Sequence, residues 1–87
     1  MSEKYHFSGR QIAAARALTG MSQAELAVAA NISVPTLRRM EGSRGPVSGY
    51  ANNVVAVRTA LESAGIIFLD AGATVDGGPG VRLATKE

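Results

Sequence analysis

The sequence contains no cysteine, no tryptophan and a single histidine. Disulfides, cysteine-ligated zinc, iron–sulfur clusters and thiol catalysis are therefore excluded, and one histidine cannot build a histidine-based metal site. We expect no bound metal and no cofactor. The residues needed for acid–base or nucleophilic catalysis are also missing as a set, so we do not expect an enzyme.

Long apolar runs are absent as well. None approaches the roughly 18 to 20 residues that span a bilayer, and Met1-Ser2-Glu3-Lys4 lacks the apolar stretch of a signal peptide. We therefore expect a cytoplasmic protein without membrane contact. The 87 residues fit one small domain. Because so short a chain buries only about 60% of its extended surface on folding, a homodimer is expected.

Charge is present but unevenly distributed. The whole chain carries +2, residues 1–50 carry +3, and residues 51–87 carry −1. A polyanionic partner would therefore bind the first half of the chain.

Capping signals divide that first half into short helices. Ser8 and Ser22 are each followed three residues later by Gln11 or Glu25, which is the pattern of a capping box. Ser33 caps a further helix, in which a proline falls in the first turn, where its missing amide costs no hydrogen bond. The expected helices cover 9–19, 23–30 and 34–41.

The second half shows two other patterns. Apolar residues recur at spacings of four, three, four and three, at Tyr50, Val54, Val57, Leu61 and Ala64. This stripe predicts a fourth helix that ends at Gly65 and packs on the first three. The β-prone run 66–69 and the alternating run 81–83, with a glycine-rich link between them, predict a β-hairpin or a pair of short strands.

The predicted fold class is therefore mainly α. A four-helix domain over residues 9–65 follows an N-terminal arm, residues 1–8, and precedes a C-terminal β extension, residues 66–87.

The strongest signal is the pair of short helices over 23–41. They are joined by a tight Asn31-Ile32-Ser33 turn, and Ala27 is small where the helices must approach closely. The stretch 23–42, QAELAVAANISVPTLRRMEG, resembles the phage-repressor-type helix-turn-helix family (the Cro/CI or XRE class), and the similarity covers about residues 9–64. Asn31 departs from the family, which usually has glycine there, but both residues accept the left-handed backbone.

The resemblance implies a sequence-specific transcriptional regulator that binds double-stranded DNA. We expect a bacterial or phage repressor that occupies a palindromic operator as a dimer. With Leu37 placed inward and about 100° per residue, Pro35 and Arg39 point outward, and arginine can bond to a guanine edge through two parallel hydrogen bonds. The expected base contacts are Ser33, Val34, Pro35, Thr36 and Arg39. The expected phosphate contacts are Arg10, Gln23, Arg38 and Arg44.

Two further expectations concern structure. The family pairs a basic residue of the first helix with an acid at the end of the recognition helix, and Arg16 and Glu41 match these positions. The alternative is that Arg16 contacts phosphate. The apolar β extension is expected to form the dimer interface. The alternative is that both strands close the core of the monomer, with dimerisation on the fourth helix or only on DNA. The expected interface residues are Ile66, Ile67, Phe68, Leu69, Val81 and Leu83.

A function of another class stays open. The same scaffold can serve as a protein-interaction module of the antiactivator or antitoxin kind. Such a module binds a protein regulator and does not bind DNA.

Overall fold

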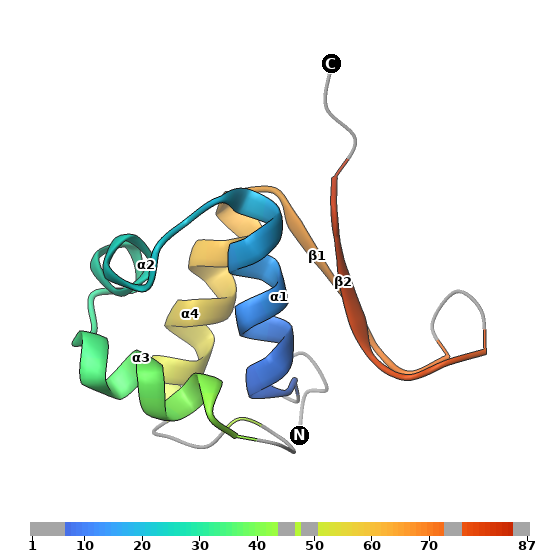
Figure 1. Cartoon of the computed structure of the whole chain (residues 1–87), viewed down its shortest axis with the longest axis horizontal. Coiled ribbons are helices and arrows are strands. Elements are labelled where there is room, and N and C mark those ends of the chain that lie inside the picture. Colours follow the sequence, from blue (N-terminus) through green and yellow to red (C-terminus); the bar gives the residue numbers. More distant parts are fainter. Residues whose placement is uncertain (1–6, 44–46, 48–50, 73–75, 85–87) are drawn as a thin grey trace.

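The computed structural model describes residues 7–43, 47, 51–72 and 76–84. Within these ranges the chain forms four helices and a two-stranded antiparallel sheet (Figure 1). The elements are α1 (Gly9–Thr19), α2 (Gln23–Ala30), α3 (Val34–Glu41), α4 (Ala51–Ser63), β1 (Ile66–Leu69) and β2 (Gly80–Leu83). The predicted mainly helical class with a C-terminal hairpin is confirmed. None of these helices is both long and apolar enough to cross a membrane.

The helix boundaries follow from local hydrogen bonds. In α2 the Ser22 hydroxyl accepts from the Glu25 amide at 3.0 Å, and the Ser22 amide donates to the Glu25 carboxylate at 2.8 Å. The same reciprocal pair opens α1 at Ser8. At the other end of α2, Asn31 adopts the left-handed conformation with φ 59°, which ends the helix. The first three helices thus begin and end where the caps predict.

The core lies between the helices. Leu26, Leu37, Val57 and Leu61 are fully buried there. The predicted stripe of α4 is confirmed at Val54, Val57 and Leu61, but Ala64 is exposed because α4 ends before it. Tyr50 lies outside the described residues, as does the predicted N-terminal arm up to residue 6.

Gly9 allows α1 to approach α3 closely. A Cβ atom at this position would lie 2.6 Å from the Glu41 carbonyl oxygen and also against the carbonyl of Met40. Real Cβ atoms do not come so close to backbone, so the start of α1 can rest on the end of α3 only because residue 9 has no side chain.

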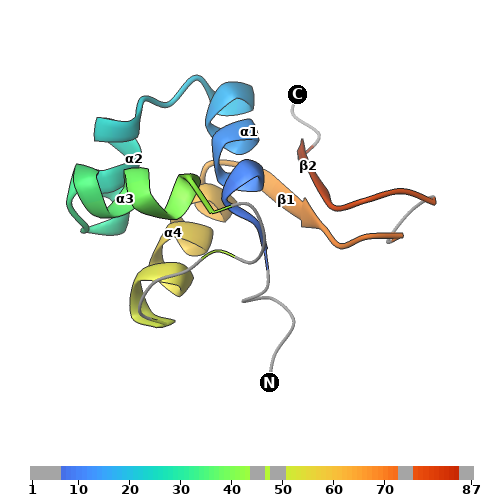
Figure 2. The same ribbon diagram turned by 60° about the horizontal axis from the view of Figure 1, so that its bottom comes forward.

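The hairpin packs across α1 and α4, and Figures 1 and 2 both show it on the opposite side of α1 from α2 and α3. Its register pairs Ile66 with Leu83 and Leu69 with Gly80. Phe68 faces the helices, where its ring lies 4.9 Å from that of Phe7 and 4.5 Å from the Arg58 guanidinium. The hairpin is therefore docked on the helical body through one of its faces.

Candidate nucleic-acid interface

The two sides of α3 have different environments. Leu37 and Met40 are 0% and 1% exposed and anchor the helix in the core. Pro35, Arg38 and Arg39 are exposed on the opposite side of the helix. A helix held in this way presents a basic face to solvent at a fixed orientation.

The five predicted base contacts divide into three groups. Pro35 and Arg39 are exposed, as expected. The Ser33 hydroxyl accepts from the Thr36 amide at 3.2 Å and donates to the Thr36 hydroxyl at 2.8 Å, so both hydroxyls already have partners. Val34 is half-buried and packs against the core. It lies three residues before Leu37, toward the inward side of the helix, and its contact with a base stays a prediction.

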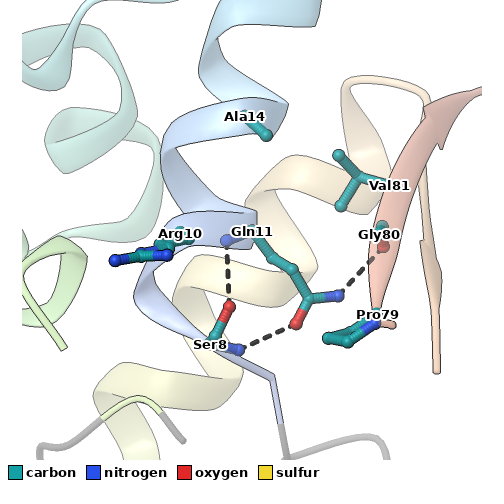
Figure 3. A pocket seen from close by; sticks show the side chains of 7 residues that line it. All are labelled: Ser8, Arg10, Gln11, Ala14, Pro79, Gly80 and Val81. Atoms are coloured by element: carbon teal, nitrogen blue, oxygen red, sulfur yellow. Dashed lines mark hydrogen bonds between the residues drawn. The ribbon is translucent and has the colours of Figure 1, made fainter. Parts of the chain in front are cut away.

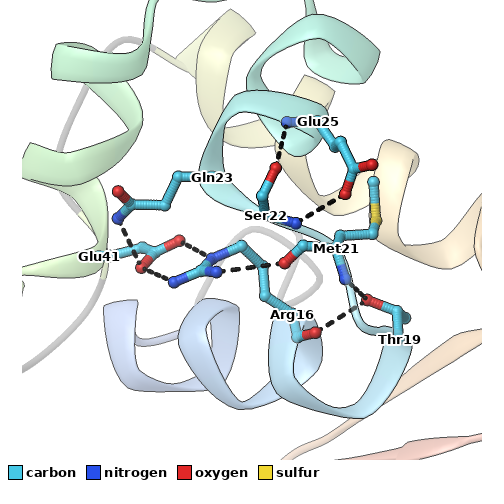
Figure 4. A network of polar contacts seen from close by, with 7 residues as sticks. All are labelled: Arg16, Thr19, Met21, Ser22, Gln23, Glu25 and Glu41. Atoms are coloured by element: carbon cyan, nitrogen blue, oxygen red, sulfur yellow. Dashed lines mark hydrogen bonds and ion pairs between the residues drawn. The ribbon is translucent and has the colours of Figure 1, made fainter.

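Arg16 and Glu41 lie together at the centre of a polar network (Figure 4). The Arg16 guanidinium donates to both carboxylate oxygens of Glu41, at 2.6 Å from Nε and 3.0 Å from Nη2. Its Nη1 donates to the Met21 carbonyl at 3.2 Å. The hydrogen bonds to Glu41 raise the pKa of Arg16 above its ordinary value.

The network joins three helices at one point. Glu41 is the last residue of α3, Arg16 belongs to α1, and Gln23 is the first residue of α2. The Gln23 side-chain amide donates to Glu41 Oε1 at 3.1 Å. All three donor nitrogens of Arg16 are engaged within the protein, which favours the structural role of this residue over the alternative of a phosphate contact.

The predicted phosphate contacts have different surroundings. Arg10 and Arg38 are exposed, on the first turn of α1 and the outer side of α3. Gln23 is half-buried and uses one N–H on Glu41, which leaves its second N–H for a ligand. Arg44 lies outside the described residues.

The structure divides the predicted dimer interface in two. Ile66 is buried, and Phe68 and Val81 pack against the same core, so these three belong to the protein's own fold. Their assignment to a dimer interface is corrected, because a strand alternates its side chains and the hairpin uses this face on its own helices. Ile67 is 43% exposed on the other face, which it shares with half-buried Leu69. Leu83 is 41% exposed. It lies on the inner face opposite Ile66, at the end of the hairpin away from the loop that joins the strands.

One buried polar side chain escaped the sequence analysis. Gln11 was expected only to cap α1, but its amide nitrogen also donates to the hairpin, to Gly80 O at 2.9 Å (Figure 3). The same nitrogen donates to Leu69 O at 3.4 Å. The only available signal in the sequence was that the capping box of α1 has a glutamine, Gln11, where the capping box of α2 has a glutamate, Glu25.

No family model matches the chain, and no curated protein matches it.

Proposed function

We propose that the protein binds double-stranded DNA sequence-specifically as a helix-turn-helix domain of the phage-repressor type, with α3 in the major groove. One observation carries this proposal: Arg38 and Arg39 are exposed on a short helix whose opposite side is fully buried. The network at Glu41 holds the end of this helix against α1 and α2. Preorganised donors of this kind are what major-groove recognition requires.

Each exposed polar residue has a distinct role in the proposed complex. Arg39 bonds to a guanine edge, and Pro35 contacts a thymine methyl group. Arg10, Arg38 and the free N–H of Gln23 contact phosphates, which fix the register of the domain on the duplex. Arg44 would add a fourth phosphate contact. Ser33 and Thr36 can reach bases once DNA replaces their mutual hydrogen bond.

We further propose that the protein binds a palindromic operator as a homodimer. The outer face of the hairpin, which carries exposed Ile67 and half-buried Leu69, supplies the contact between the two copies. A two-fold dimer would place two α3 helices in half-sites about 34–36 Å apart.

The proposed biological role is repression of transcription in the cytoplasm of a bacterium or of a phage-infected cell. The protein would block a promoter by occupying it, without catalysis or a cofactor. Control would then come from the abundance of the protein or from a protein partner.

Selection from a random duplex library, followed by titration of the selected duplex, tests the proposal. Arg39→Ala should weaken binding to that duplex by about 1–3 kcal/mol and relax the preference at one base pair. Arg38→Ala should weaken selected and scrambled duplexes alike. Ser63→Ala is the control, because this exposed residue lies at the end of α4, outside both α3 and the hairpin, and should leave affinity unchanged.

Salt provides the second arm of the test. Affinity should fall steeply with added salt, because each phosphate contact releases counterions. If no duplex is enriched, or if Ser63→Ala costs as much as Arg39→Ala, the proposal fails. The protein-interaction module would then be the better hypothesis.

A further inference from the structure

Gln11 connects the helical domain to the hairpin. Its side chain is buried, with 5% of the residue exposed, between α1 and β2. Oε1 accepts from the Ser8 amide at 2.8 Å, and Nε2 donates to Gly80 O at 2.9 Å and to Leu69 O at 3.4 Å. Leu69 and Gly80 form the last pair in the register of the strands. The amide thus holds both strands at this last pair, and Figure 3 shows its bond to Gly80 of β2.

A comparison within the chain separates this connection from helix capping. The capping box of α2 has the same geometry, with Glu25 in the place of Gln11 and with an exposed side chain. A carboxylate accepts the capping hydrogen bond as well as an amide does, but it has no N–H to donate. Capping alone therefore does not require glutamine at residue 11, whereas the two hairpin carbonyls do.

The turn of α1 that carries Gln11 also touches the end of α3. Gly9, two residues earlier, lies against the backbone carbonyls of Met40 and Glu41. Contacts to the hairpin and to α3 are thus only two residues apart on one rigid helical turn. The direction of the hairpin is thereby fixed relative to α3.

We propose that Gln11 is a positioning residue that sets the half-site separation accepted by the dimer. This inference rests on the proposed function. In a dimer that forms through the hairpins, the separation of the two α3 helices depends on the angle at which each hairpin leaves its own domain. Gln11 holds that angle, although it contacts neither DNA nor the partner.

The variant Gln11→Glu tests this role. It keeps the oxygen that caps α1 but replaces the N–H donors by a second oxygen, which faces two carbonyl oxygens. Glu25→Gln is the matched control, because it makes the reverse change in the box of α2, away from the hairpin. Both variants and the wild type are measured by hydrogen exchange of the β1 and β2 amides and by sedimentation. Binding is measured to the selected duplex with its half-sites moved by one and two base pairs.

The wild type and Glu25→Gln should prefer one separation by about tenfold or more, because a shifted half-site leaves base contacts unmade. Gln11→Glu should stay dimeric and bind a single half-site as the wild type does. The hairpin amides of Gln11→Glu should exchange at least about tenfold faster than those of the wild type. Its affinity for the preferred half-site separation should exceed its affinity for the shifted ones by about threefold or less. Lowering the pH should partly restore amide protection, since the protonated carboxyl can donate to one carbonyl.

Several results would overturn the role of Gln11. An unchanged spacing preference together with faster hairpin exchange would show that the hairpin angle does not set the separation. Unchanged exchange would show that the amide does not hold the hairpin, and a monomeric variant would make Gln11 an assembly residue. If Gln11→Glu does not fold, Gln11→Met is used, with the same outcomes apart from the pH response. A wild type that binds no duplex would instead refute the proposed function, and the spacing role with it.

Discussion

The α2–α3 unit and the hairpin are organised in different ways. In the α2–α3 unit, each helix begins at a serine whose hydroxyl accepts an amide three residues later, and Glu41 joins the unit to α1 through charged hydrogen bonds. In the hairpin, apolar side chains of the described residues pack on the helices, and the donors of Gln11 and the cation–π contact of Arg58 add to these contacts.

The difference shows that local capping interactions define the α2–α3 unit, whereas contacts with distant residues define the hairpin. Caps act over three residues and depend little on the rest of the fold, so the α2–α3 unit can be defined largely by its own sequence. A two-stranded hairpin is marginal alone and needs a surface to pack on. Its orientation must therefore be supplied by residues far away in the chain, such as Gln11 and Phe7.

The largest expected effect comes from breaking the network that holds α3. Glu41→Ala leaves the guanidinium of Arg16 and the amide of Gln23 without their acceptor, at a cost of about 3 kcal/mol in the free energy of unfolding, since the pair is partly buried. Urea denaturation followed by circular dichroism measures this. The control is Glu62→Ala, which breaks the more exposed pair with Arg58 within α4 and should cost about 0.5 kcal/mol. Equal costs would contradict the central role of Glu41.

The next effect concerns two neighbouring residues of β1. Ile66 is 2% exposed and Ile67 is 43% exposed. Ile66→Ala should cost about 2 kcal/mol, because it opens a cavity under the hairpin, while Ile67→Ala should change the stability of the monomer by less than about 0.5 kcal/mol.

Sedimentation of the same two variants tests which face of the hairpin contacts a second copy. Ile67→Ala should weaken the proposed dimer more than Ile66→Ala does. A reversed order in the stability measurements would mean that the hairpin docks through its other face.

The boundaries of the helices could be predicted from the sequence because their causes are local. The serine caps, Asn31 and the stripe of α4 all act within a few residues. The helical period that places Arg39 outward also places Val34 three residues before Leu37, toward the core, which agrees with its half-buried side chain.

The orientation of the hairpin could not be predicted in this way. All four residues of β1 are apolar, so alternation cannot say which face packs on the helices. The same ambiguity explains why Ile66, Phe68 and Val81 were assigned to a dimer interface. Gln11 was missed for a related reason: its partners are 58 and 69 residues away along the chain.

A smaller effect tests the capping of α2. Ser22→Ala removes the acceptor for the Glu25 amide and should cost about 1 kcal/mol in the free energy of unfolding. Ser63→Ala, at the exposed end of α4, is the control and should stay within about 0.5 kcal/mol of the wild type. A change at Ser22 no larger than at Ser63 would show that tertiary packing rather than the cap defines the start of α2.

The smallest effect is expected for the substitution Asn31→Gly. Asn31 is the one described non-glycine residue with a positive φ, at 59°. Glycine relieves the strain of the left-handed backbone but adds freedom to the unfolded chain, and the two effects oppose each other. Asn31→Gly should therefore change the free energy of unfolding by less than about 0.5 kcal/mol. Asn31→Val should cost about 1–3 kcal/mol, since a β-branched side chain tolerates this conformation poorly. Thermal denaturation of both variants measures the difference. If Asn31→Val were as stable as Asn31→Gly, the turn between α2 and α3 would not need its left-handed residue, and the α2–α3 unit would depend on tertiary contacts as the hairpin does.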